Sequence, residues 1–255
     1  MIIDTHAHLD ELDNLDEALA EARECGITAI IAVGSNHQSN LKVMEISHKH
    51  SPFIYPALGL HPCDLSDLKA SQIDYTLKHI EEMASDIVAI GEIGLDYDKR
   101  VTKVSPKEQQ KEVLKRLLAI AREYEKPAII HSRYAWKDCF ELTKEARVNK
   151  VIFHWFTGFS SVLRDILNAG YFISATPAAE YHQEHRRAIK ETPLEKLLLE
   201  TDCPVVYGRE TKYRSAPVDI LKSLRAVAAL KGVDEDITAE QTTYNAAQLF
   251  NITPH

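Results

Sequence analysis

The sequence predicts an eight-stranded (β/α)8 barrel, or TIM barrel, that forms a single domain over residues 1–255. Short apolar runs alternate with amphipathic helical segments along the whole chain. The runs are apolar almost throughout, which is typical of parallel strands covered on both faces. Residue types that bind divalent metals stand where several of these runs end. Active sites of such barrels lie at the carboxyl ends of the strands, so we expect a metal site there.

Eight runs are expected to form the strands. They are residues 1–5, 27–33, 53–58, 87–93, 127–131, 150–154, 171–175 and 197–201. Eight strands with helices between them favour the barrel over an open, doubly wound sheet. The seventh run is short, and residues 177–192 after it carry no clear helix signal.

The expected helices are delimited by their capping residues. Residues 105–124 form the clearest one, because Ser105 and Glu108 make a capping box and Pro106 takes the first helical position. The last helix is expected to start at Thr238, with Gln241 three residues on, and to run to Phe250. Further helices are expected at 16–25 before Gly26, at 160–169 before Gly170, and at 216–231 before Gly232.

Composition narrows the class of protein. The chain has 45% hydrophobic and 27% charged residues, as expected of a globular protein, and no low-complexity linker. It opens on a strand pattern without a signal-peptide pattern, and no apolar run reaches the length of a membrane span. Four scattered cysteines argue against a disulfide scaffold, so a cytoplasmic location is expected. The net charge of −8 argues against a broad nucleic-acid surface but permits a phosphate substrate, since bound cations supply positive charge locally.

His6 and His8 end the first strand. Side chains two residues apart in a strand point the same way, so both imidazoles can face the barrel mouth. Imidazole nitrogen suits zinc, manganese, iron and nickel. The alternative is a pair of surface histidines. Their place after the first strand of a barrel favours metal binding.

Two carboxylates occupy similar positions. Glu92 lies between Gly91 and Gly94, and its two oxygens could bridge two cations. Asp202 follows the eighth strand, beside the first strand of a closed barrel. One of its oxygens could bind a metal while the other takes a proton from water as a general base. A helix cap is the structural alternative for each.

Further residues follow other strands. His131 and His154 end the fifth and sixth, and together they indicate metal binding although either alone would suit a core. His61 is expected to orient ligands or contact substrate. Arg133 and Arg214 could hold a phosphate, although either could be an ordinary surface arginine. Three aromatic residues near strand ends could stack on a base or pack in the core, namely Tyr97, Tyr134 and Trp155.

At these positions the chain resembles the TatD family of metal-dependent deoxyribonucleases. The resemblance is carried by 4–10, 59–62, 92–97, 131–133, 153–158, 200–204 and 245–250. It implies two divalent ions, magnesium or manganese, whereas the softness of four imidazole ligands favours zinc or manganese. His6, His8 and Asp202 would hold one ion, His131 and His154 the other, with Glu92 as the bridge. Residues 213–217 and 177–190 depart from the family pattern, which leaves the substrate less determined.

The expected activity is that of a metal-dependent hydrolase. The first hypothesis is a deoxyribonuclease that cleaves phosphodiester bonds in single-stranded DNA or at DNA ends, through a water bridged by two divalent metals, with Asp202 and Glu92 as catalytic residues. One alternative is a hydrolase of a small ester, amide or lactone on the same scaffold, and another is a non-catalytic metal-binding protein. Oligomeric state is left open, with a monomer among the options.

Overall fold

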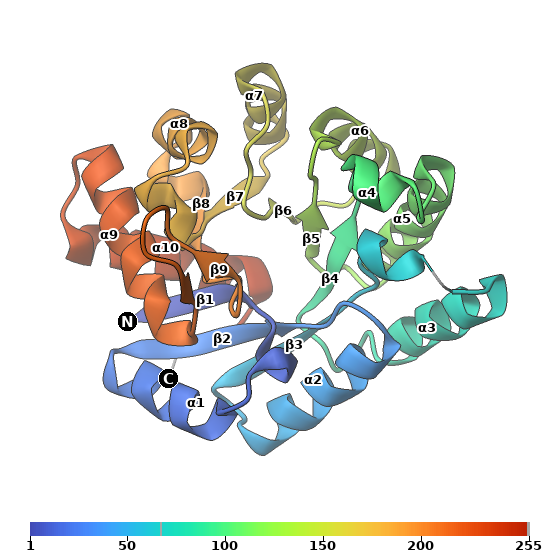
Figure 1. The fold of residues 1–255 in the computed structure, drawn as a ribbon, viewed down its shortest axis with the longest axis horizontal. Coiled ribbons are helices and arrows are strands. Elements are labelled where there is room, and N and C mark those ends of the chain that lie inside the picture. The colour runs from blue at the N-terminus through green and yellow to red at the C-terminus, as the bar shows by residue number, and fades with distance from the viewer. Residues whose placement is uncertain (67, 254–255) are drawn as a thin grey trace.

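The computed structural model describes residues 1–66 and 68–253, and it has the predicted (β/α)8 architecture. Eight parallel strands pair in sequence order around a central axis (Figure 1). They are β1 Ile2–Ala7, β2 Ile27–Val33, β3 Ile54–Leu58, β4 Ala89–Gly94, β5 Ala128–His131, β6 Val151–Phe153, β7 Phe172–Ala175 and β8 Leu197–Leu199.

The barrel is closed between β1 and β8 mainly by contacts just beyond the end of β8. Ala7 and Cys203 form an isolated parallel bridge, and the amide of Asp202 donates to the His6 carbonyl at 2.9 Å. Below them, the Asp4 carboxylate accepts hydrogen bonds from the amide of Thr201 at 3.0 Å and from its hydroxyl at 2.6 Å. The first and last strands are therefore joined at the level of the strand ends.

Helices surround the strands (Figure 1). They are α1 Leu15–Glu24, α2 His37–Lys49, α3 Ala70–Glu82, α4 Lys99–Thr102, α5 Lys107–Glu123, α6 Trp136–Ala146, α7 Ser160–Asn168, α8 Gln183–Glu191, α9 Ile220–Lys231 and α10 Glu235–Phe250. One core cluster lies between strands and helices. A second contains alternate strand residues such as Ala29 and Ile31, packed with Leu249 and Phe250 of α10. The last helix therefore helps to fill the barrel interior.

Several predicted boundaries are wrong. The capping box at Ser105 and Glu108 does not form, because Pro106 stays extended at ψ 144° and α5 starts at Lys107. The buried Ser105 hydroxyl has no hydrogen-bond partner among the described residues. The last helix starts at Glu235, where Asp234 accepts from the Asp236 amide, and not at Thr238. The Thr238 hydroxyl instead donates to the Asp234 carbonyl, inside the first turn.

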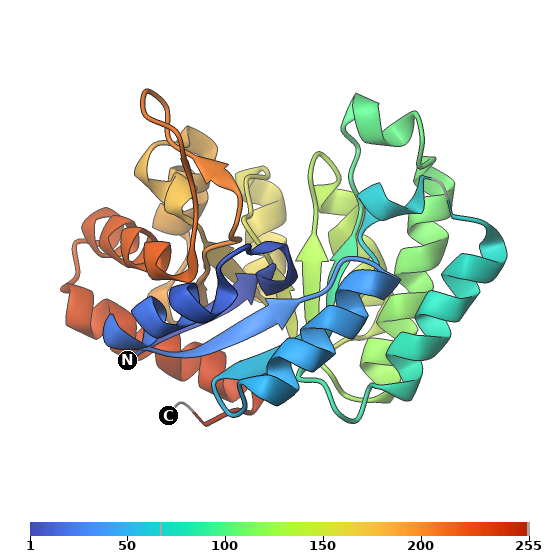
Figure 2. The ribbon, with the colours of Figure 1, turned by 60° about the horizontal axis from the view of Figure 1, so that its bottom comes forward.

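The segment without a clear helix signal, 177–192, folds as a short 3-10 turn, Pro177–Glu180, followed by α8. Two other segments stand above one end of the barrel (Figure 2). These are α4 and a hairpin of β9 Val206–Tyr207 and β10 Tyr213–Arg214. In the part of the chain that the structure describes, no helix is both long enough and apolar enough to span a membrane.

Candidate metal centre

The six predicted metal ligands converge at the carboxyl ends of the strands. His6 lies in β1 and His8 just after it, Glu92 lies in β4, and His131 ends β5. The remaining two directly or closely follow strands, His154 after β6 and Asp202 after β8. Four of the residues are almost fully buried, at 0% exposure for His6, 4% for Glu92 and 6% for both His154 and Asp202. Residues almost 200 positions apart thus meet at one point.

One oxygen of Glu92 faces the histidines of β1. Glu92 Oε2 lies 3.4 Å from the Nε2 atoms of both His6 and His8. Asp202 Oδ1 lies 3.5 Å from the same two nitrogens. The two Nε2 atoms are 3.2 Å apart. Four polar atoms therefore surround one point in space.

The other oxygen of Glu92 faces the opposite way. Glu92 Oε1 lies 2.8 Å from His131 Nδ1 and 2.8 Å from His154 Nε2. His61 Nε2 approaches the same oxygen at 3.5 Å. The carboxylate thus stands between two groups of histidines, the arrangement that a bridging ligand requires.

Outer contacts orient two of these rings. His8 Nδ1 lies 3.1 Å from the Val33 carbonyl, which can only accept, so Nδ1 carries the proton and Nε2 keeps its lone pair. His131 lies between two carboxylates, with Nδ1 2.8 Å from Glu92 Oε1 and Nε2 3.2 Å from Asp96 Oδ2. With its proton on Nε2, toward Asp96, the ring presents the Nδ1 lone pair to Glu92 and to a cation beside it. Such outer partners orient metal-binding imidazoles and raise their basicity.

His61 carries its proton on the nitrogen that faces Glu92. Its Nδ1 accepts the Cys63 amide at 3.2 Å, so in the neutral ring Nε2 carries the proton and points at Glu92 Oε1. This nitrogen is a hydrogen-bond donor and not a free metal ligand. The geometry is compatible with the role predicted for His61, which stays a prediction.

The donor set fits divalent cations. His131 Nδ1 and Glu92 Oε1 are both acceptors in the neutral-imidazole form, and two acceptors 2.8 Å apart require a proton or a cation between them. Although burial alone would lower the pKa of His131, its contacts with Asp96 and Glu92 raise it. Burial would raise the pKa of Glu92, yet the surrounding histidines hold it well below its usual range. Both directions have the same cause, the attraction between the carboxylates of this cluster and positive charge on the groups beside them.

The backbone around the site permits these close approaches. A Cβ on Gly94, which has φ +150°, would collide with the His131 carbonyl oxygen. A Cβ on Gly59 would collide with the Glu92 backbone. Asp202 itself has φ +51°, a left-handed conformation that is rare for a non-glycine residue and clusters at functional sites.

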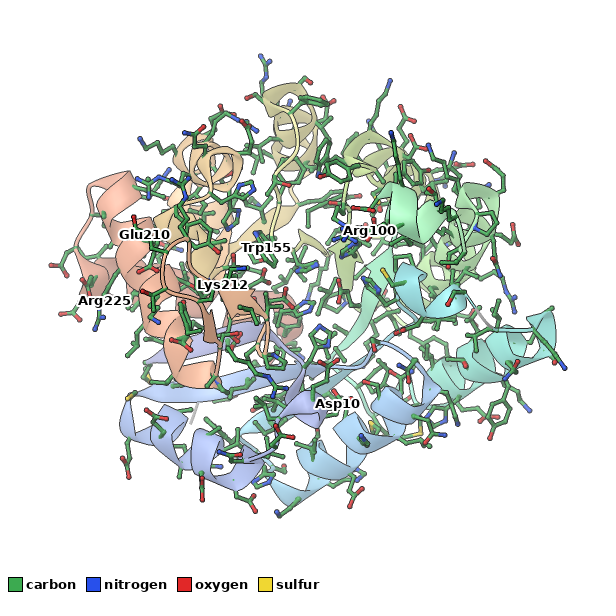
Figure 3. All side chains as sticks on the ribbon, viewed as in Figure 1. Asp10, Arg100, Trp155, Glu210, Lys212 and Arg225 are labelled. Atoms are coloured by element: carbon green, nitrogen blue, oxygen red, sulfur yellow. The ribbon has the colours of Figure 1, made fainter. Side chains whose placement is uncertain are left out.

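A cleft of about 960 Å³ opens over the metal centre. Its lining includes His61, Arg133 and Asp202. In Figure 3, Trp155, another lining residue, lies inside the ring of helices, whereas Arg225 on α9 lies at the periphery. The cleft is therefore large enough to take more than the reacting group of a substrate.

The structure places the two predicted phosphate-binding arginines differently. Arg133 lines the cleft, but its guanidinium also forms a two-pronged pair with Asp96, at 2.7 Å for Nη2 to Oδ2 and 3.1 Å for Nε to Oδ1. Arg214 is not among the cleft-lining residues. Its guanidinium is half exposed and pairs with Asp13 at 3.0 Å.

Sequence reasoning missed two buried carboxylates behind the ligands. Asp96 holds His131, as described, and is fully buried. Glu200 Oε1 lies 3.5 Å from His154 Nδ1 and accepts the Trp155 amide at 3.0 Å. Asp96 lies in segment 92–97 and Glu200 in segment 200–204, which carry the family resemblance. An acidic residue within an apolar segment was the sequence feature that could have identified each of them.

Comparison with known proteins gives matches over nearly the full chain. A family model described as "TatD related DNase" matches residues 3–251. Human "Deoxyribonuclease TATDN3" is 33% identical, and the match covers 98% of this chain and 94% of that protein. A Bacillus subtilis "Uncharacterized metal-dependent hydrolase YabD" is 34% identical, covering 99% and 100%. The "3'-5' ssDNA/RNA exonuclease TatD" of Erwinia tasmaniensis is 30% identical, covering 93% of each chain.

Among solved structures, the chain is similar to a TatD homologue from Escherichia coli, YJJV. That similarity has a TM-score of 0.88 at 26% identity and covers 99% of this chain and 98% of the other. The fold and its order of elements are therefore shared along the whole length.

Proposed function

The chain belongs to the TatD family of related DNases, and we propose that it is a metal-dependent deoxyribonuclease that hydrolyses phosphodiester bonds in single-stranded DNA or at DNA ends. The observation that carries this proposal is the position of Glu92, whose two oxygens face two separate groups of histidines. The name of the Erwinia relative supports a single-stranded substrate.

We assign His6, His8 and Asp202 to one divalent ion, His131 and His154 to a second, and Glu92 to both. When bound, such ions act as Lewis acids toward a phosphate and lower the pKa of water. Metal identity is an open part of the proposal, with magnesium, manganese and zinc as the candidates. Ligand softness favours zinc or manganese for a site with four imidazoles.

The chain's own groups then have distinct tasks. Asp202 lines the cleft, and despite its burial the neighbouring histidines lower its pKa, so it is ionised and can accept a proton from the attacking water. The Nε2–H of His61 is a donor that can reach a phosphate oxygen. Arg133 is held by Asp96 with its charge toward the cleft. Arg214 remains a proposed substrate contact at the rim, where it donates to the Glu11 carbonyl at 2.8 Å.

The alternative substrate class, a small ester, amide or lactone, has less support. The relatives above whose names print a specific activity are a deoxyribonuclease and a single-strand exonuclease.

The test compares Glu92→Gln and Asp202→Asn with Glu240→Gln, a control at an exposed position on α10. Each protein is assayed on a labelled single-stranded oligodeoxynucleotide and on a panel of small esters, with magnesium, manganese or zinc added. Cleavage of DNA by both site variants should fall by at least about 100-fold, the usual contribution of a general base, while the control keeps wild-type activity. Circular dichroism and elemental analysis check folding and metal content. Full activity in a properly metallated site variant would refute the assignment of roles.

A further inference from the structure

Three large aromatic side chains form a row at the edge of the cleft, which we call the aromatic ridge: Tyr134, Trp136 and Phe159. The Tyr134 and Trp136 ring centroids are 5.9 Å apart at 70°, and those of Trp136 and Phe159 are 5.4 Å apart at 79°. Tyr134 is 61% exposed and Phe159 68% exposed. Large aromatic surfaces left in water next to a cleft indicate a binding site.

The ridge is continuous with the metal centre. Tyr134 and Trp136 line the same cleft as His131 and Glu92. Tyr134 also follows the proposed ligand His131 by three residues along the chain. A substrate whose phosphate lies at the metals therefore has neighbouring groups within reach of the ridge.

The rings are held in place by the backbone beneath them. The indole of Trp136 packs directly on Gly158, where a Cβ would lie 2.5 Å from the indole Cγ. Arg187 of α8 donates to the Gly158 carbonyl and to the Ser160 hydroxyl, which fixes the turn that carries Phe159. Tyr134 has φ +57°, a conformation unfavourable for a bulky residue. The ridge is thus positioned before any ligand binds.

The charges of the side chains that line the cleft indicate which kind of contact could bind a nucleic acid there. Arg133 is the one arginine or lysine among the described residues that line it, and this side chain is already paired with Asp96. Glu11, Asp64 and Glu184 also line the cleft and are acidic. Proteins that bind single strands usually combine a positive groove with aromatic platforms. Since the described lining has one basic side chain besides the proposed metal site, contacts to the parts of a substrate away from the metals would depend on the aromatic faces.

The other two aromatic residues predicted to contact bases have partners outside the ridge, although Trp155 also lines the cleft. Tyr97 donates its hydroxyl to Asp138 at 2.7 Å, and Lys107 Nζ covers its ring at 4.1 Å. Trp155 packs against Tyr207 at 5.4 Å between ring centroids. Of the three, Tyr134 is the one with an exposed ring in the ridge.

We propose that the aromatic ridge is a base-stacking subsite that holds unpaired nucleobases next to the scissile phosphate. This inference rests on the proposed nuclease function. A base paired in a duplex has its faces covered by neighbouring pairs, so the subsite selects single strands. Because every base offers a flat face, the selection depends little on sequence.

The experiment compares the double variant Tyr134→Ala/Phe159→Ala with Tyr244→Ala, a control that removes an equally exposed tyrosine from α10. The substrates are a single-stranded oligodeoxynucleotide and an oligonucleotide of the same length with abasic residues around the cleaved bond. Wild-type protein should have a KM at least about 10-fold lower for the first substrate, as stacking of one or two bases provides. The double variant should lose this difference with kcat within about two-fold, and Tyr244→Ala should keep it.

Binding is measured independently of cleavage by quenching of tryptophan fluorescence and by anisotropy of a labelled strand in the presence of a chelator. Wild-type protein that binds the normal strand more tightly than the abasic one, yet cleaves neither strand when magnesium, manganese or zinc is added, would refute the nuclease and retain the subsite. Equal affinity for both strands, or a double variant with wild-type affinities, would overturn the subsite. A wild-type protein that binds neither strand would overturn it as well.

Discussion

At the scale of single residues, the centre depends on which proton each imidazole carries. The sequence predicted the six residues that converge, because strand ends in a barrel share one rim. It could not predict the tautomers, which are set by tertiary neighbours such as the Val33 carbonyl and the Asp96 carboxylate. Asp96 also changes the interpretation of Arg133, because the Arg133 guanidinium pairs with Asp96 in addition to facing the cleft.

Asp96→Asn should therefore weaken metal binding without removing a proposed ligand. The substitution keeps an acceptor oxygen for His131 Nε2 but removes the charge that raises the basicity of the ring. We expect the affinity for manganese or zinc to fall by about 10- to 100-fold in isothermal titration. Asp74→Asn, on the exposed face of α3, should leave affinity unchanged. An unchanged affinity in Asp96→Asn would show that the outer carboxylate has no part in binding.

At the scale of elements, the strands were predictable and the helix starts were less so. Continuous apolar runs marked all eight strands to within a few residues, because a buried parallel strand allows few polar positions. The predicted start of α5 was wrong because tertiary hydrogen bonds of one side chain, Gln110, form in place of the predicted cap at Ser105. The Gln110 side chain accepts the Asp96 amide at 2.8 Å and donates to the carbonyls of Asp96 and Ser105 at 3.1 and 2.7 Å. The start of α10 could have been predicted from the sequence, because aspartate is a strongly preferred N-cap residue and Asp234 stands at that position.

Mutation can compare the contributions of the predicted cap at Ser105 and of the Gln110 hydrogen bonds to the stability of α5. Ser105→Ala removes a buried hydroxyl that has no described partner, so the free energy of unfolding should change by less than about 0.5 kcal/mol or rise. Gln110→Ala breaks three buried hydrogen bonds and should lower it by about 2 kcal/mol or more. Urea denaturation of the two variants provides both values. A working capping box would give the reverse order.

At the scale of the whole molecule, architecture and metal-ligand convergence followed from the sequence, whereas the substrate surface did not. Strand order and the shared rim are consequences of chain topology. The aromatic ridge, in contrast, joins the loop after β5 to the turn before α7, and its spacing depends on how Trp136 packs on Gly158. Residues 177–190, which depart from the family pattern, supply His182 and Glu184 to the cleft lining. In the other departing segment, 213–217, the Ser215 amide donates to the carbonyl of the lining residue Val205.

Acid should destabilise the folded chain partly through His185. Its ring is fully buried, with Nδ1–H donating to the Phe156 carbonyl at 3.0 Å and Nε2 accepting the Thr176 amide at 3.1 Å. Burial lowers the pKa of His185 from 6.5 to about 4. Below pH 6.5 the unfolded chain takes up a proton that the folded chain does not. Stability is therefore lost as the pH falls toward 4, by about 3 kcal/mol from this group.

The measurement is the free energy of unfolding between about pH 4 and 7, with a chelator present, for wild type and His185→Gln. Glutamine has no charge change in this range, so the difference between the two proteins should shrink as the pH falls. A difference that is independent of pH would show that His185 already takes up its proton in the folded state.

The junction between β1 and β8 has a consequence for the timing of activity. His6 is synthesised 196 residues before Asp202, yet His6 Nε2 and Asp202 Oδ1 lie 3.5 Å apart in the folded protein. A nascent or prematurely terminated polypeptide lacks the final carboxylate and the seam that positions it. With Asp202 in its proposed role, nuclease activity would arise only after the eighth strand has been made and has closed the barrel.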